Sequence, residues 1–266
     1  MNDIEHQYLL TKEQAHTFGR DGVLFLPNVL VAEALLRVQK AAERASERSG
    51  GFWFKIYLWR DDPDFRWCAM NSALPGVAAQ LLGKRRLTLL YDQLFVKHPQ
   101  DKATPWHNDL PYWPIEGSSV ISIWIALSYV SQINGGLEFI RGSHLWQDKF
   151  ETFSADYDVG QDIQLPAMQA DDSKAIPDFD NLRNEFDIVS FDLNPGDAVA
   201  FHALTVHHAL PNQTSTRSRA GYSLRFMGDD VRYREGLGMN EQVFNSSLTT
   251  GDKMESEQYP VVFSDY

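Results

Sequence analysis

The stretch Thr104-Pro105-Trp106-His107-Asn108-Asp109 organises the rest of the chain, because it places a His-x-Asp pair directly before a long apolar run. On an extended strand, side chains two residues apart point to the same face, so His107 and Asp109 can converge on one point. An imidazole and a carboxylate so placed form a chelating pair, and a third ligand must come from elsewhere in the fold.

A second stretch, from Gly196 to His208, reads as a turn that feeds another buried strand carrying candidate ligands. Strand alternation allows only one of the adjacent His207 and His208 to face inward. Two histidines and one carboxylate on one face, with coordination positions left open, are the ligand set of non-haem Fe(II) oxygenases.

The chain becomes rich in strands after about residue 86. Turn segments such as 133–136 and 194–197 separate apolar or alternating runs that are rich in β-branched and aromatic residues. The runs are 87–97, 120–130, 136–140, 186–193, 198–207 and 220–226. The fold class we predict is mainly β with flanking helices, with a double-stranded β-helix core (jelly roll, cupin-like) and helices on one outer face.

Helices are expected before these strands. Thr11-Lys-Glu-Gln14 matches a capping box, and the apolar spacing over 31–49 predicts a longer helix after a short strand at 23–27. The aromatic run 52–59 fits either a strand or a pocket wall. A further helix is predicted from about residue 71 to Gly83, whose position suits a left-handed C-cap.

We expect one domain over residues 1–266, with a helical part at about 1–85, the jelly-roll core at about 86–228 and an irregular tail at 229–266. The acidic segment 148–184 interrupts the strand series and is interpreted as a lid or an interface loop. The oligomeric state cannot be read from the sequence.

The net charge of −12 opposes binding to nucleic acid or anionic lipid, and the basic cluster Lys84-Arg85-Arg86 fits a solvated corner between a helix and a strand. The single cysteine, Cys68, excludes an intramolecular disulfide and fits a small buried side chain in a reducing compartment. No signal peptide begins the sequence, and no apolar run approaches the roughly 18 residues of a membrane span. We therefore predict a cytoplasmic protein.

An ordered set of motifs resembles the phytanoyl-CoA dioxygenase family. The motifs are WHND at 106–109, SIWIAL at 122–127, NGGLEFIRGSH at 134–144, Gly196-Asp197 to His207 with Pro211-Asn212, and the run from Arg219 through Tyr222 to Arg225-Phe226. The resemblance covers about residues 15–235 and implies a jelly-roll dioxygenase that depends on Fe(II) and 2-oxoglutarate. It would convert 2-oxoglutarate and O2 to succinate and CO2.

The resemblance implies that His107, Asp109 and His207 hold the iron. The gaps to His202 and Asn212 favour His207 over His208. Because Asp109 is present, whereas related halogenating oxygenases lack this carboxylate, hydroxylation is favoured over halogenation.

The same resemblance implies that Arg219 grips the far carboxylate of 2-oxoglutarate. If its strand and that of His207 were antiparallel neighbours, the guanidinium would face the metal. Arg217 stays an alternative, because the interval from Asn212 to Arg219 is one residue longer than expected. Other candidates are Trp124 along the cosubstrate, Gln93 and Asn108 as neighbours of the site, and His144 as a structural residue.

The substrate is expected to be a small organic molecule with an apolar body, such as a secondary metabolite, because several aromatic residues are candidates to line its pocket. These are Trp53, Phe54, Tyr57, Trp59, Tyr112 and Trp113, with Arg66, Arg141 and Arg225 as candidates to hold a carboxylate. Two other hypotheses stay open: a redox-neutral isomerase or hydrolase using the same ligands with another metal, and a non-catalytic small-molecule-binding jelly roll.

Overall fold

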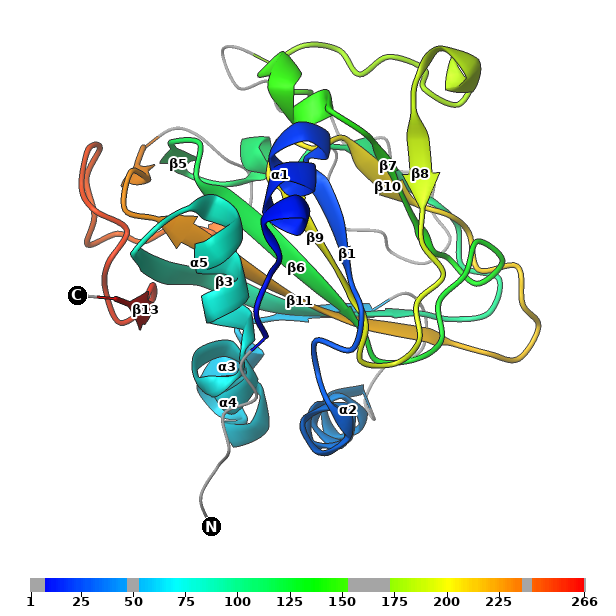
Figure 1. Cartoon of the computed structure of the whole chain (residues 1–266), viewed down its shortest axis with the longest axis horizontal. Coiled ribbons are helices and arrows are strands. Elements are labelled where there is room, and N and C mark those ends of the chain that lie inside the picture. The colour runs from blue at the N-terminus through cyan, green and yellow to red at the C-terminus, as the bar shows by residue number, and fades with distance from the viewer. Residues whose placement is uncertain (1–7, 47–52, 153–172, 236–240, 266) are drawn as a thin grey trace.

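The computed structural model describes residues 8–46, 53–152, 173–235 and 241–265, and shows two facing antiparallel sheets with helices outside one of them (Figure 1). The helices are α1 (Lys12–Asp21), α2 (Ala32–Ser46), α3 (Leu58–Asp61), α4 (Pro63–Asn71) and α5 (Leu74–Leu82). Short 3-10 helices are η1 (Leu110–Tyr112), η2 (Ser143–Trp146), η3 (Arg183–Glu185) and η4 (Glu241–Val243).

The larger sheet, called the major sheet, has the order β1-β9-β6-β11-β3-β13, with β2 also paired to β3. Its strands are β1 (Val23–Leu26), β2 (Trp53–Ile56), β3 (Arg86–Lys97), β6 (Val120–Ala126), β9 (Ala198–His202), β11 (Arg219–Gly228) and β13 (Val261–Ser264). The minor sheet has the order β4-β10-β7-β8, made of β4 (Thr104–His107), β10 (His207–Ala209), β7 (Leu137–Ile140) and β8 (Ile188–Ser190). A small ribbon pairs β5 (Ile115–Glu116) with β12 (Arg232–Tyr233). The double-stranded β-helix that we predicted is confirmed.

Alternation along the major strands supplies two buried faces. On β6, for example, Ile121, Ile123 and Ile125 belong to the outer core under the helices, whereas Trp124 and Ala126 belong to the core between the sheets. Both faces are covered, so β6 reads as a continuous apolar run, and every residue in it is buried.

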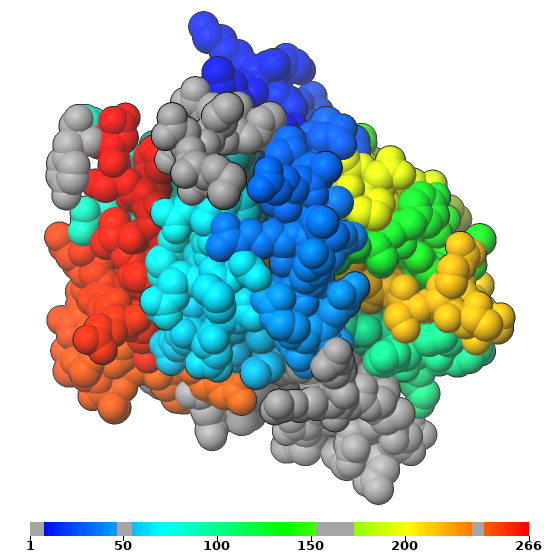
Figure 2. Space-filling view, turned by 90° about the horizontal axis from the view of Figure 1, so that it is seen from below, coloured from blue at the N-terminus to red at the C-terminus, as the bar shows by residue number. Residues whose placement is uncertain are grey.

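Helices α2 to α5 cover the outer face of the major sheet, and in Figure 2 α2 lies beside the cyan α3–α4 region with the red C-terminal segment beyond it. The predicted signals at the start of α1 and at the end of α5 are confirmed. Thr11 and Gln14 form the capping box of α1, and Gly83 ends α5 in the left-handed conformation with φ of 62°. Cys68 is fully buried in this outer core.

Three expectations about the elements need correction. The run 58–71 forms two helices, α3 and α4, that we did not predict; the second begins with Asp62 as N-cap and Pro63 in its first turn. The run 198–207 is not one strand, because the chain crosses from β9 in the major sheet to β10 in the minor sheet. The tail is not wholly irregular, because β13 pairs with β3.

The outer side of the minor sheet is covered by the described end of the acidic segment. Arg183 donates to both carboxylate oxygens of Glu138 on β7, and Asp180 accepts a hydrogen bond from the Trp106 indole. Residues 153–172, the middle of the predicted lid or interface loop, lie outside the described residues. Within the described ranges, no helix is long and apolar enough to cross a membrane.

Candidate metal and cosubstrate site

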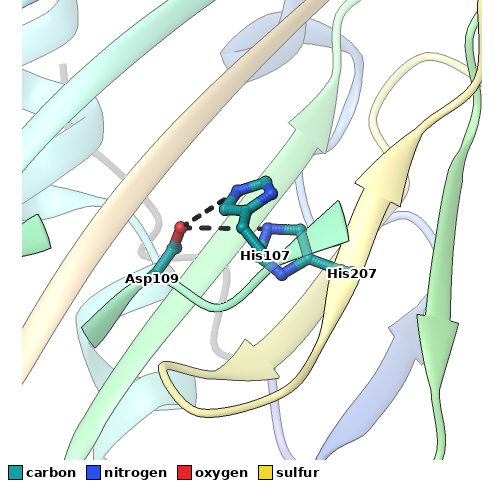
Figure 3. A group of neighbouring side chains, drawn as sticks. All are labelled: His107, Asp109 and His207. Carbon is teal, nitrogen blue, oxygen red and sulfur yellow. Dashed lines mark ion pairs between the residues drawn. The ribbon is translucent and has the colours of Figure 1, made fainter. Parts of the chain in front are cut away.

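Pairing of β4 with β10 brings the two predicted histidine ligands together. His207 lies directly opposite His107 in the register of these antiparallel strands, and their ring centres are 4.2 Å apart. Both point into the space between the sheets, toward Asp109 (Figure 3). The two ligand-bearing strands, which lie about 100 residues apart in the sequence, are therefore direct neighbours in the minor sheet.

Asp109 leaves β4 and turns toward the histidines because its backbone is bound to the β9–β10 crossing. Its N–H donates to the carbonyl of Ala203 at 2.9 Å. Its Oδ1 atom lies 3.6 Å from His107 Nε2 and 3.8 Å from His207 Nε2. The three candidate ligand atoms lie within 4.8 Å of one another, which suits a single bound cation.

The tautomer of each histidine is set by the main chain. His107 Nδ1 donates to the carbonyl of Pro105 at 2.8 Å, and His207 Nδ1 donates to that of Thr205 at 2.9 Å. A carbonyl only accepts, so each Nδ1 carries the proton and each Nε2 carries the lone pair that a metal needs.

Burial also prepares these residues for a metal. Burial, with the neighbouring His207, lowers the pKa of His107 to about 3, and burial likewise lowers the pKa of His207. For Asp109, burial acts to raise the pKa, but Arg225 and the two histidines outweigh it and hold the pKa below its usual value. Two neutral imidazoles and one carboxylate are the protonation states that metal coordination requires.

His208 faces the opposite side of the minor sheet, as alternation requires. Its Nε2 lies 2.7 Å from Glu138 Oε2, and its ring stacks on Trp106 with centres 3.9 Å apart. The structure therefore places His207, not His208, beside Asp109.

Arg219 lies on the inner face of β11 and is 2% exposed, whereas Arg217 is exposed. The guanidinium donates twice to the carbonyl of Gly135, and no carboxylate of the described residues lies within 4 Å of it. Burial lowers its pKa to about 10. The expectation that the strands of Arg219 and His207 are antiparallel neighbours was wrong. Strands β11 and β10 belong to facing sheets, so Arg219 faces the metal site across the barrel interior.

A second buried cation, Lys97, lies directly opposite Arg219 on β3. Its side chain is fully buried and donates to the carbonyl of Leu210 at 2.8 Å. Burial, and then the charge of Arg219, lower the pKa of Lys97 to about 7. Two cations buried side by side favour an anion between or beside them, because desolvated charges of one sign raise each other's energy.

Trp124 lies beneath Arg219, with the guanidinium carbon 5.2 Å from the ring centre. The ring occupies the space above Gly221, where a Cβ atom would lie 1.8 Å from Trp124 Cζ2. Glycine is thus required at this strand position by the close approach of the indole. Gln93 is opposite Ser223 in the register and shares this inner face.

Among the predicted substrate-contacting residues, the aromatic ones divide into two groups. Tyr112 meets the His107 ring edge-on at 5.9 Å, and Trp113 is buried and donates to the hydroxyl of Tyr91. The Tyr57 ring packs at a tilt against the Tyr91 ring, with centres 6.0 Å apart, and its hydroxyl accepts a hydrogen bond from Gln258. Trp53 lies in β2, but its side chain is outside the described residues; Trp59 packs in the outer core under the helices, away from the site.

The arginine candidates also separate. Arg225 lies beside Asp109, its Nε atom 3.8 Å from Asp109 Oδ2. Arg141 forms ion pairs with Asp21 and Asp187, and none of its observed contacts is with the triad. Arg66 donates to backbone carbonyls of the α3 region.

Two polar candidates have structural roles. Asn108 does not contact the triad through its side chain, which donates to the carbonyl of Asp148 and accepts from the N–H of Phe150. It therefore holds the start of the covering segment against the minor sheet. His144 is structural, as predicted: it is buried, with Nε2 3.2 Å from the carbonyl of Gly19.

Sequence reasoning missed Lys97, Gly221, Ser122 and Ser223 at this site. Ser122 donates to Asp109 Oδ2 at 3.1 Å, and Ser223 is buried on β11. A signal existed for all four, because a lysine, a glycine and two serines in mainly apolar strands each need an explanation.

Two histidines and a carboxylate inside a double-stranded β-helix form the metal-site arrangement that is typical of non-haem Fe(II) oxygenases. The model of the family "Phytanoyl-CoA dioxygenase (PhyH)" matches residues 18–221. The chain belongs to this phytanoyl-CoA dioxygenase family, which is a family of Fe(II)/2-oxoglutarate-dependent oxygenases.

Individual relatives are distant. A probable phytanoyl-CoA dioxygenase of Caenorhabditis elegans is 25% identical over 214 residues, or 77% of this chain and 64% of that protein. The L-proline trans-4-hydroxylase of Streptomyces griseoviridis is 26% identical over 218 residues, or 75% of this chain and 80% of that protein. The chain spans 64% and 53% of the first two curated relatives.

Solved structures share the fold. The non-haem alpha-ketoglutarate-dependent carbocyclase SnoK from nogalamycin biosynthesis superposes with a TM-score of 0.72 and 24% identity. The match covers 95% of this chain and 96% of that one.

Proposed function

We propose that this chain is an Fe(II)- and 2-oxoglutarate-dependent dioxygenase that oxidises, by hydroxylation, a small organic molecule. Two features of one arrangement carry the proposal. The ligand atoms of His107, Asp109 and His207 converge on one point, and Arg219, on the facing sheet, is buried with no carboxylate of the described residues paired to it. A redox-neutral metalloenzyme would need the first feature but not the second.

The donor set fits Fe(II). Two imidazole nitrogens and one carboxylate oxygen form a facial triad that leaves coordination positions for other molecules. When bound, iron and 2-oxoglutarate would allow O2 to act as the oxidant: one oxygen atom would enter succinate as 2-oxoglutarate loses CO2, and the other would become the new hydroxyl of the substrate. Asp109 supplies the carboxylate that related halogenating oxygenases lack, so the position that a halide takes in those enzymes would be filled here, which supports hydroxylation over halogenation.

The chain's own residues have three tasks in this chemistry. The carbonyls of Pro105 and Thr205 orient the two imidazoles. Arg219, with Trp124 beneath it, would bind the far carboxylate of 2-oxoglutarate through charge-assisted hydrogen bonds. The buried walls between the sheets exclude water, so these charges act at low dielectric.

The family does not identify the substrate. The relatives named above are called a phytanoyl-CoA dioxygenase and an L-proline hydroxylase, and the solved neighbour is called a carbocyclase. These names describe unrelated molecules, so the substrate class has to be inferred from the site itself.

The test is an anaerobic titration with Fe(II) and then 2-oxoglutarate, followed by the visible charge-transfer band of a keto acid chelated to iron. The wild type is expected to show the band. In Arg219→Ala, half-saturation should need a 2-oxoglutarate concentration at least about 30-fold higher. This corresponds to a loss of about 2 kcal/mol or more of binding free energy from a buried charged pair. Arg217→Ala, at an exposed position two residues away, serves as the matched control and should behave as wild type.

Iron binding without a band in the wild type would exclude the oxygenase and favour a redox-neutral metalloenzyme. A band with equal 2-oxoglutarate affinity in wild type and Arg219→Ala would refute the role of Arg219 while leaving the metal assignment intact.

A further inference from the structure

The guanidinium of Arg225 is buried beside the triad with donors that are not used. The residue is 6% exposed, and its Nε and Nη1 atoms have no hydrogen-bond partner among the described residues. Three aromatic rings surround it: its guanidinium carbon lies 4.6 Å from the Tyr91 ring centre, 5.7 Å from that of Trp113 and 5.9 Å from that of Phe95.

A second unused polar group lies next to it. Ser223 is two residues away on the same face of β11 and is 1% exposed, and its hydroxyl has no hydrogen-bond partner in the part of the chain that the structure describes. A buried donor that is left without a partner destabilises the folded state, and a charged donor does so more strongly than a neutral one. Two such groups side by side indicate a place built for a ligand rather than for packing.

The nearby carboxylate of Asp109 does not satisfy Arg225. The closest approach, Nε to Oδ2, is 3.8 Å, which is beyond hydrogen-bonding distance. That same oxygen already accepts from Ser122 at 3.1 Å. A bound metal cation would also offset the negative charge of Asp109. The positive charge of the Arg225 guanidinium would therefore remain available to a ligand anion.

The anion that would bind to Arg225 is not 2-oxoglutarate. With one end of 2-oxoglutarate at the metal and the other at Arg219, both of its carboxylates are in use. Arg225 lies six residues further along β11, about 20 Å away in backbone terms. Its guanidinium is held against Tyr91, whereas that of Arg219 is held against Gly135.

We propose that Arg225 and Ser223 form the anion-binding end of the primary substrate site, and that the substrate is a carboxylic acid oxidised at a carbon close to its carboxylate. This inference rests on the proposed oxygenase function and specifies its substrate class. The carboxylate accepts from the guanidinium and from the Ser223 hydroxyl. Because Arg225 is beside a triad ligand, the carbons next to the carboxylate are the ones brought to the metal.

The surroundings hold this cation in place before any ligand arrives. Trp113 donates to the Tyr91 hydroxyl at 2.9 Å, and Tyr57 packs against Tyr91 at 6.0 Å, so the wall behind the guanidinium is a connected aromatic unit. A guanidinium stacked in this way keeps its edge free for a bidentate carboxylate. The same rings provide apolar surface for the body of the acid.

The test uses the protein loaded anaerobically with Fe(II) and saturating 2-oxoglutarate, and two probes of equal shape, phenylacetate and phenylacetamide. Binding is followed by the shift of the charge-transfer band and by calorimetry. Phenylacetate should bind at least 10-fold more tightly than phenylacetamide in the wild type. The preference should disappear in Arg225→Gln, weaken in Ser223→Ala and persist in part in Arg225→Lys, with Arg217→Gln as the surface control.

Equal binding of the two probes, or binding of neither, overturns the proposal even when the band is present. A preference that survives Arg225→Gln also overturns it. If Arg225→Gln instead weakens 2-oxoglutarate or iron binding by 10-fold or more, Arg225 positions Asp109 or the cosubstrate, and the substrate role is refuted. Absence of the band in the wild type is the separate failure of the oxygenase proposal.

Discussion

Replacing Gly221 with alanine should damage the cosubstrate site through a single added methyl group. The new Cβ atom would lie 1.8 Å from Trp124 Cζ2 and 2.3 Å from Cε2. Carbon atoms in contact stay about 3.5–4.0 Å apart, so the indole must move by roughly 1.7 Å or more. Overpacking of this kind costs about 1–3 kcal/mol of stability.

The displaced indole should also weaken 2-oxoglutarate binding, because it lies 5.2 Å beneath the guanidinium of Arg219. Loss of a cation–π contact of about 0.5–2 kcal/mol corresponds to roughly a 2- to 30-fold rise in Kd. Urea unfolding measures the first effect, and anaerobic titration of the charge-transfer band measures the second.

Gly19→Ala is the matched control. Gly19 lies inside α1, and a Cβ atom there would have no neighbour within 4 Å. The same substitution should therefore stabilise the protein by about 0.5–1 kcal/mol through helix propensity, and leave 2-oxoglutarate affinity unchanged. Wild-type stability together with wild-type affinity in Gly221→Ala would refute the steric argument.

Three other predictions follow from the contacts described. His207→Ala should abolish the charge-transfer band, whereas His208→Ala should keep it and lose about 1–3 kcal/mol of stability, because Glu138 loses a buried partner; a band lost only in the second variant would reverse the ligand assignment. Burial raises the pKa of Asp92 to about 7, partly offset by hydrogen bonds from Tyr222 and the Trp59 N–H, so the folded state retains a proton that the unfolded state releases near pH 4. The free energy of unfolding should therefore fall between about pH 4 and 7, and fall less in Asp92→Asn, as urea titrations at several pH values can check; an identical slope in both proteins would contradict this. Burial raises the pKa of the Cys68 thiol, so a thiol reagent should label it only at the rate at which the protein opens; fast labelling of the folded protein would show that the outer core is more accessible than described.

The metal ligands could be predicted from the sequence because they follow from strand alternation over a few neighbouring residues. His107 and Asp109 are two residues apart, and alternation at His207 and His208 leaves one ring facing inward. The strand runs were equally readable, since turn residues separate them and their faces are apolar.

The sheet in which each strand lies could not be read in this way. The run 198–207 is buried almost throughout, and apolar residues lie on both sides of Ala203, so nothing in its pattern marks the crossing between the sheets there. The approach of Arg219 across the barrel was missed for the same reason, since it depends on which sheets face each other. Helix α4 is a different case: Asp62-Pro63 is a good start signal, but the dense aromatic residues around it obscured the helical period.

The backbone carbonyls that hold His107 and His207 have a consequence for how this site can survive sequence change. Each ring is oriented by the main chain two residues before it, at Pro105 and at Thr205, and every amino acid supplies such a carbonyl. The orientation of the ligands is therefore inherited with the path of the strand and not with any neighbouring side chain. In a family whose members are only about a quarter identical to this chain, the side chains around the two histidines can therefore change extensively without changing the orientation of the imidazole rings.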